Sequence, residues 1–198
     1  IISSLIKKYP KNIVGMKDSE NNLEKTFDHI EHSCGMITKK TNQNLNQRSV
    51  IMLEGKRILL VISGGIAAYK SLDLIRHLRE EGVLVRCVLT KAATKFITPL
   101  SVSVLSEEKV FNDLFSLTDE NEMGHIQLSR ESDLIVIAPA TANILSSMAQ
   151  GVADDLATTV LLASNKTIMA APSMNVRMWE HEATIHNLNF LCNRGVHF

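Results

Sequence analysis

The chain has 198 residues, which is enough for one α/β domain with a hydrophobic core and an appendage. Its 21 basic and 21 acidic residues balance, so the charge pattern indicates binding neither to nucleic acid nor to an anionic membrane surface. No apolar run approaches the roughly 20 residues that span a bilayer, the N-terminus lacks the order of a signal peptide, and the odd number of cysteines favours a reducing compartment, so we expect a cytoplasmic protein.

The first 51 residues differ in composition from the rest of the chain. Lys, Asn, Ser and Gln are frequent there, and residues 38–49 contain a single apolar side chain, Leu45. Such a composition is typical of a linker, because it offers little surface that a core could bury. We therefore predict a weakly structured leader over residues 1–51 and one domain over residues 52–198.

From Arg57 onward, apolar runs alternate with segments of helical periodicity. Five consecutive apolar residues, 58–62, are typical of a strand buried on both faces, and a glycine pair follows them directly. Strands interleaved with helices predict a doubly wound, mostly parallel α/β sheet of Rossmann-like type. The predicted strands are 58–62, 83–89, 134–138 and 168–171, and the predicted helices are 71–81, 99–105, 154–163 and 180–193.

Small, hydroxyl and amide side chains follow each predicted strand. Because parallel strands end at the same edge of a sheet, these groups are expected to meet there. Turn formation or helix capping accounts for any one segment, whereas all four together favour a ligand site. The segments are residues 63–65, 90–91, 139–143 and 172–175.

The glycine pair, Gly64 and Gly65, precedes a predicted helix, an arrangement that suits a phosphate group. A dinucleotide site would need a third glycine and an acidic residue after the second strand, but Thr90 and Lys91 stand there instead. The glycine-rich loop typical of nucleoside triphosphate sites is also absent from the sequence. A mononucleotide is therefore the favoured ligand.

His125 is the histidine with the strongest case for a role in chemistry. It follows a polar, acidic loop and precedes a helix-like segment, where it could orient or deprotonate a substrate near neutral pH. The alternative is an ordinary residue at a helix start. His181 and His186 are five positions apart, which does not match a helical metal pair, so we predict no metal site.

Four motifs in one order give the chain a family resemblance. They are residues 63–70 (SGGIAAYK), 124–126 (GHI), 139–143 (PATAN) with 151–156 (GVADDL), and 172–179 (PSMNVRMW). With these motifs, residues 56–198 resemble the flavin-containing cysteine decarboxylases. The resemblance implies FMN at the strand ends, contacted by Gly64, Gly65, Ile66, Thr90, Ala140, Thr141, Asn143 and Ala171.

The resemblance also implies a reaction, the decarboxylation of 4'-phospho-N-pantothenoyl-cysteine to 4'-phosphopantetheine in coenzyme A biosynthesis. His125 matches the essential histidine of the family, and Asn175, together with Met178, matches its substrate-binding motif. Flavin accepts a hydride from the carbon that bears sulfur, which creates the electron sink that loss of CO₂ requires. The family's flap cysteine, which donates a proton on return of the hydride, would follow Phe198, so the sequence reads as a truncated form whose full turnover is in question.

The resemblance leaves two other functions open. One is a flavin prenyltransferase on the same scaffold, which residues 172–179 disfavour, and the other is a non-catalytic flavin-binding regulatory subunit. Members of the family assemble as trimers with the flavin near the subunit boundary, so a homotrimer or an assembly of trimers is implied. About the first 27 residues resemble a fragment of the dihydrodipicolinate synthase family, with Lys17 at its Schiff-base position, but without the barrel we expect no such activity.

Overall fold

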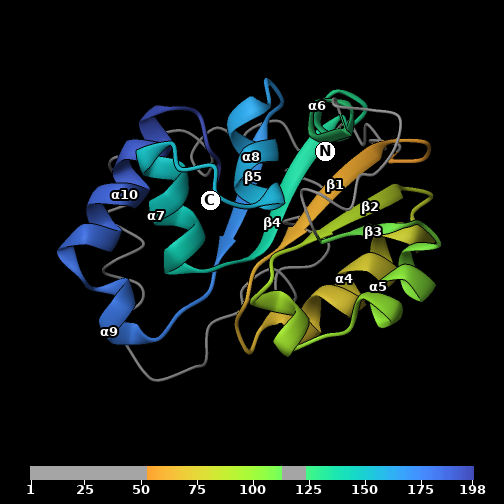
Figure 1. Ribbon diagram of the computed structural model, residues 1–198, viewed down its shortest axis with the longest axis horizontal. Helices are drawn as coiled ribbons and strands as arrows, with labels where there is room; N and C mark the ends of the chain where they lie inside the picture. Colours follow the sequence, from red (N-terminus) through yellow and green to blue (C-terminus); the bar gives the residue numbers. More distant parts are fainter. Residues whose placement is uncertain (1–52, 113–123) are drawn as a thin grey trace, which may run out of the picture.

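The computed structural model describes residues 53–112 and 124–198. These residues form a five-stranded, entirely parallel sheet of strand order β3-β2-β1-β4-β5, shown in Figure 1. The strands are β1 (Arg57–Ile62), β2 (Leu84–Leu89), β3 (Val110–Phe111), β4 (Leu134–Ala140) and β5 (Ile168–Pro172). The predicted α/β class and the parallel sheet are thus confirmed.

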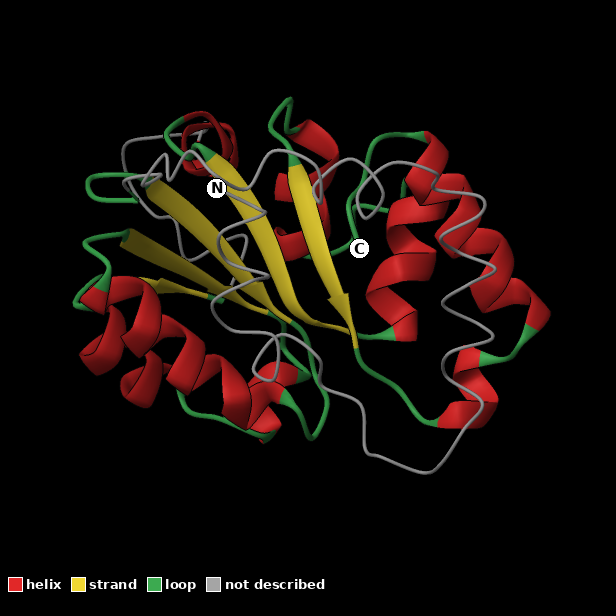
Figure 2. Ribbon diagram, turned by 180° about the vertical axis from the view of Figure 1, so that it is seen from behind, coloured by secondary structure: helices red, strands yellow, loops and turns green. Residues whose placement is uncertain are grey.

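Helices cover both faces of this sheet, as Figure 2 shows from behind. One face packs against α4 (Ala68–Glu80) and α5 (Pro99–Ser106). The opposite face packs against α6 (Gly124–Arg130), α7 (Ala142–Gln150), α8 (Leu156–Ala163) and α10 (Glu182–Asn193). Two short helical segments, η1 (Ala93–Lys95) and α9 (Val176–Trp179), lie in connections that follow β2 and β5.

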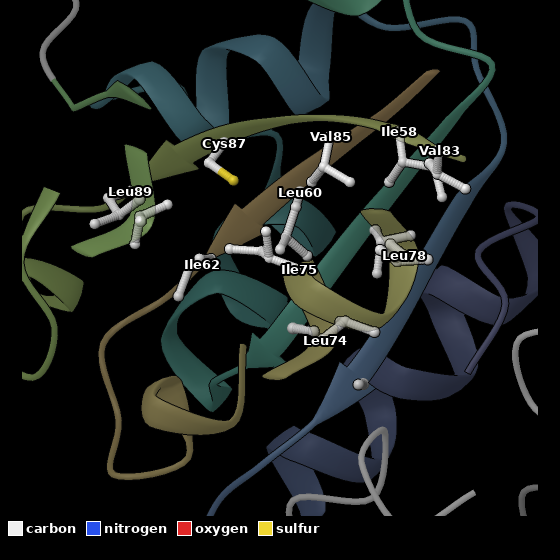
Figure 3. Packing of buried hydrophobic residues seen from close by; sticks show 14 of the residues in the cluster. Ile58, Leu60, Ile62, Leu74, Ile75, Leu78, Val83, Val85, Cys87 and Leu89 are labelled. Carbon is white, nitrogen blue, oxygen red and sulfur yellow. The ribbon is translucent and has the colours of Figure 1, made fainter. Parts of the chain in front are cut away.

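Alternation along β1 divides the core into two clusters. Leu60 and Ile62 face α4, while Leu59 and Val61 face the other layer, and all four are at most 1% exposed. Figure 3 shows the first cluster, in which side chains of β1 and β2 meet Leu78 and its neighbours on α4. An apolar run without polar positions is therefore what a central strand between two helical layers requires.

Helix caps explain where several helices begin. Thr98 accepts a hydrogen bond from the amide of Ser101, and Pro99 stands at the first helical position, as the sequence predicted. Asp155 and Thr158 form a capping box, so α8 begins at Leu156, two residues later than predicted.

The structure also contains elements that the sequence did not predict, namely β3, η1, α7 and α9. Helix α4 begins three residues earlier than expected, and β4 continues through Pro139 to Ala140, although a proline was expected to end it. The chain does turn back to the sheet after α10, because His197 forms a parallel bridge with Met169. The predicted leader, residues 1–51, lies outside the described residues and stays a prediction.

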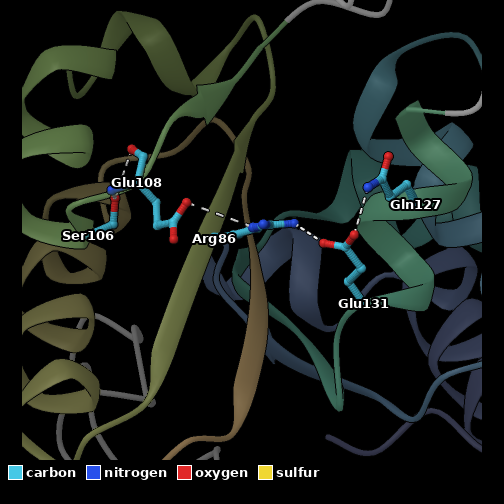
Figure 4. Close-up of polar contacts among 5 residues, drawn as sticks. All are labelled: Arg86, Ser106, Glu108, Gln127 and Glu131. Carbon is cyan, nitrogen blue, oxygen red and sulfur yellow. Dashed lines mark hydrogen bonds and ion pairs between the residues drawn. The ribbon is translucent and has the colours of Figure 1, made fainter. Parts of the chain in front are cut away.

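An ion-pair network, drawn in Figure 4, joins β2 to the end of α6 and to the residues that precede β3. The guanidinium of Arg86 bonds the carboxylate of Glu131, directly after α6, and lies 3.8 Å from that of Glu108, before β3. Gln127 donates a hydrogen bond of 2.7 Å to the same Glu131. Hydrogen bonds from Gln127 and Arg86 hold the pKa of Glu131 below its usual range.

This lowered pKa predicts a stability that depends on acid. The carboxylate of Glu131 stabilises the folded chain above its unfolded pKa of about 4.5, and that contribution disappears as the pH falls through the lower folded value. We expect Glu131→Gln to lower the urea midpoint at pH 7 and to have a smaller effect near pH 3. Glu80→Gln, at an exposed residue that forms no ion pair with the described residues, is the control. An equal effect of Glu131→Gln at both pH values would contradict this account.

Candidate functional site

The carboxyl ends of all five strands lie at one edge of the sheet, near the bottom centre of Figure 1. The chain leaves β1 for α4 on one side and leaves β4 for α7 on the other, so the winding of the sheet reverses between these neighbouring strands. Ligands of open α/β sheets bind at such a switch point. The predicted segments that follow β1, β2, β4 and β5 are therefore brought to a common edge.

The turn between β1 and α4 contains Gly64 and Gly65. Neither has a positive φ, so a left-handed backbone is not the reason for the pair. A Cβ on Gly64 would lie 2.3 Å from the Cβ of Ala92, which follows β2, so this position has no room for a side chain. The glycine turn is thus packed tightly on the β2–η1 connection.

Main-chain donors are left open in this turn. The amides of Gly64, Gly65 and Ile66 donate no hydrogen bond to the described residues, and α4 has no side-chain cap. The neighbouring α7 also begins without a side-chain cap at Thr141. Two adjacent helix starts thus have amides without a hydrogen-bond acceptor among the described residues. Such amides suit an anionic or strongly hydrogen-bonding ligand.

Ser63 links the two helix starts. Its hydroxyl donates to the carbonyl of Pro139 at 2.6 Å and accepts from the amide of Thr141 at 3.1 Å, and the side chain is 2% exposed. A Cβ on Gly65 would lie 3.4 Å from Cγ2 of Thr141, so the two segments are in near contact. The position of Ser63 at the strand end follows from the sequence, whereas its hydrogen bonds from β1 to β4 have no local sequence signal.

The other predicted cofactor residues also lie at this edge. Thr90 directly follows β2, and its hydroxyl accepts a hydrogen bond from the amide of Ala93, so it forms part of a turn. The carbonyl of Ala140 accepts from the amide of Ser173, which ties the end of β4 to the segment after β5. Ala171 is buried in β5 next to this tie, and Asn143 is exposed in the first turn of α7.

Asn175 caps α9, and the cap orients its amide group. Oδ1 accepts a hydrogen bond of 2.9 Å from the amide of Met178, so the NH₂ group points away from the helix and donates to no described residue. Both Asn175 and Met178 are exposed, the latter by 43%. A capped asparagine with open donors is suited to a carboxylate ligand.

The structure does not bring the backbone of His125 to this edge. His125 lies in the first turn of α6, and in Figure 1 this helix stands beside the amino-terminal end of β4, at the top of the view. The amide of Asp133, shortly after α6, donates to the carbonyl of Arg57 at the start of β1. Within the described chain, α6 is therefore anchored at the amino ends of the central strands.

Charge is nearly absent from the carboxyl edge itself. The residues at 63–67, 90–91, 139–143 and 171–175 are all uncharged except Lys91. The described residues include no group of three or more His, Cys, Asp or Glu side chains that could hold a metal ion. Burial raises the pKa of the Cys87 thiol to about 12, so this residue of β2 has no thiolate to offer near neutral pH. The described part of this edge therefore offers hydrogen-bonding groups rather than charged side chains.

Comparison with known proteins agrees with this geometry. The model of the Flavoprotein family matches residues 46–198, which include every strand and helix described above. The chain belongs to the Flavoprotein family. The family match and the relatives described below confirm the membership in the flavin-containing decarboxylases that four sequence motifs predicted.

Relatives of this flavoprotein include larger proteins. The chain is 47% identical over 144 residues to the coenzyme A biosynthesis bifunctional protein CoaBC of Vibrio vulnificus (strain YJ016) and 45% identical over the same length to that of Escherichia coli (strain K12). These matches cover 73% of this chain and 36% of each relative, so the chain spans about a third of their length.

Solved structures share the fold. An FMN-dependent cysteine decarboxylase, SpaF, superposes with a TM-score of 0.70 and 30% identity over 73% of this chain and 83% of its own. A mutant PPC decarboxylase in complex with pantothenoylaminoethenethiol gives a TM-score of 0.62 and 34% identity over 72% of this chain and 80% of its own. Among the described residues of the flavoprotein, no helix has the length and apolar character needed to traverse a membrane.

The close approach at Gly64 makes a specific prediction. Gly64→Ala introduces a Cβ that collides with Ala92, and overpacking of this kind should lower the free energy of unfolding by about 1–3 kcal/mol. Gly65→Ala is the matched control, because its Cβ meets Thr141 only at 3.4 Å. Urea denaturation of the ligand-free chain measures both. If the two variants were equally stable, the packing account of Gly64 would be wrong.

Proposed function

We propose that this chain binds FMN at the carboxyl edge of its sheet and decarboxylates 4'-phospho-N-pantothenoyl-cysteine to 4'-phosphopantetheine, a step of coenzyme A biosynthesis. The observation that carries the proposal is the pair of uncapped helix starts at the switch point, in a chain of the Flavoprotein family. The likeness to CoaBC proteins and to a PPC decarboxylase supports the choice of substrate.

The residues at this edge fit FMN. The open amides of Gly64, Gly65 and Ile66 provide donors for a phosphate or for ring oxygens, and the missing side chain at Gly65 lets a ligand come close to the backbone. Thr90, Ala140, Thr141, Asn143 and Ala171 complete the cofactor contacts that the family resemblance implies. The flavin, when bound, supplies the redox chemistry that lets an ordinary amide-bearing carbon lose CO₂.

Asn175 and His125 are the residues proposed for the substrate. The amide NH₂ of Asn175, held outward by the α9 cap, donates hydrogen bonds to the substrate carboxylate, with Met178 beside it. His125 orients this carboxylate and handles a proton near neutral pH. The Ser, Thr and Asn side chains at the edge do not exchange protons near neutral pH. The proton transfer therefore requires a residue, such as His125, that lies outside these strand-end segments.

The proposed assembly is a homotrimer, or a set of trimers, in the cytoplasm. Helix α6 is anchored at the amino ends of β1 and β4, while the open helix starts lie at their carboxyl ends. A six-residue strand such as β1 is about 20 Å long, and this length separates the anchored end of α6 from the open helix starts of the same copy. A second copy that places α6 near this edge would complete the site, which supports a flavin at a subunit boundary.

Decarboxylation is tested with the FMN-loaded chain. CO₂ release from 4'-phospho-N-pantothenoyl-cysteine labelled in its carboxyl group should fall by about 10²-fold or more in His125→Asn, because a positioned acid–base group is lost. His186→Asn, at an exposed residue of α10, is the control and should retain activity. A colourless protein that cannot be loaded with FMN would overturn the proposal. Equal activity of His125→Asn and wild type would favour a flavin-binding subunit without this chemistry.

Mixing of subunits tests the shared site. His125→Asn and Asn175→Ala chains should each be inactive alone, but should recover part of the wild-type activity when they are unfolded together and reassembled. Recovery occurs because some sites in a mixed trimer then combine an intact histidine from one copy with an intact asparagine from another. Light scattering checks that the mixture is trimeric. Absence of any recovery in mixed trimers would show that one copy supplies both residues.

A further inference from the structure

The ladder of β4 is interrupted next to the proposed flavin site. Its pairing with β1 ends at Ile137, and its register with β5 shifts between Ile137 and Ala140. Residues 138 and 139 therefore lie at an irregular point of the ladder, shortly before the start of α7 at Ala142, although the carbonyl of Pro139 also accepts a backbone hydrogen bond of 3.3 Å from the amide of Ser63. Whatever holds this segment also sets the position of the α7 start.

Two serines of the β1–α4 unit hold it. Ser63 bonds the carbonyl of Pro139 and the amide of Thr141, and Ser71, on the sheet-facing side of α4, donates to the carbonyl of Ala138 at 2.7 Å. The carbonyls of two consecutive residues are thus each bonded by a serine hydroxyl. Both serines are 2% exposed, so each hydrogen bond is shielded from water.

The two serines differ in one respect that matters for a ligand. Ser63 belongs to the turn that faces the site, whereas Ser71 lies about one turn into α4, beneath the helix start and against β4. A buried hydroxyl in that position does not touch a bound molecule. Any influence that it has on ligand binding must pass through the position of the Ala138 segment.

We propose that Ser71 is a positioning residue for the flavin site. Through the carbonyl of Ala138 it sets the distance between the glycine turn and the start of α7, so that the open amides of both can reach one ligand. This inference rests on the proposed FMN function. Without the hydroxyl, a buried carbonyl loses its donor, and the irregular end of β4 is free to shift toward another partner.

The test compares the affinity of purified protein for FMN with its stability. FMN fluorescence quenching should give a dissociation constant on the order of tenfold higher for Ser71→Ala than for wild type. Ser106→Ala is the matched control, because Ser106 is equally buried on α5 and its hydroxyl contacts the carbonyl of Glu108, which precedes β3. It should lower the melting temperature without changing the affinity for FMN by more than about twofold.

Ser71→Cys keeps the shape of the side chain with a weaker donor, and it should give an intermediate affinity. If Ser71→Ala does not fold, the FMN affinity of Ser71→Cys tests the inference in its place. Wild-type affinity in both Ser71 variants, or an equal loss in Ser106→Ala, would overturn the inference while leaving the proposed function intact. A wild-type chain that binds no FMN would overturn the proposed function, and this inference with it.

Discussion

Burial of β1 and β4 on both faces is the constraint on which the rest of the structure depends. Strands without a polar face, such as residues 58–62, must lie between two layers, and the connections that supply those layers are helices that cross over the sheet. Crossover connections make neighbouring strands parallel. Parallel strands end at one edge, and a site with contributions from four strands follows from that geometry.

The same constraint explains why the site is made of backbone. Where β1 and β4 emerge from the core, the chain must turn at once into α4 and α7, and each helix start brings amides without intrahelical partners. Side-chain hydroxyls of Ser63 and Ser71 satisfy carbonyls of the β4 segment instead of capping these helices. The described edge is therefore rich in donors and poor in charge, a combination suited to a flavin phosphate and ring.

Sequence patterns predicted the long, strongly apolar elements well and the irregular ones poorly. The run at 58–62 and the Thr98 cap depend on local chemistry, so they could be read directly. The two-residue strand β3 and the helix α7 have no such local signature, and Pro139 was expected to end a strand that continues past it. The role of Ser71 depends on a register shift between distant strands, which no local pattern reveals. The sequence predicted the position of the glycine turn correctly. The requirement for glycine at residue 64, however, comes from its tight contact with Ala92, which is a matter of tertiary packing.

The shortness of β3 leaves part of the edge of the described sheet unpaired. β3 pairs only with Cys87 and Val88, so the first half of β2 is an outer edge of the described sheet. An open edge invites another strand to add to it, and aggregation begins in this way. Here the edge is only partly open and carries Arg86 with its two carboxylate partners, whose charges and bulk oppose strand addition. The charged first half of β2 therefore disfavours extension of the described sheet by a strand from outside it.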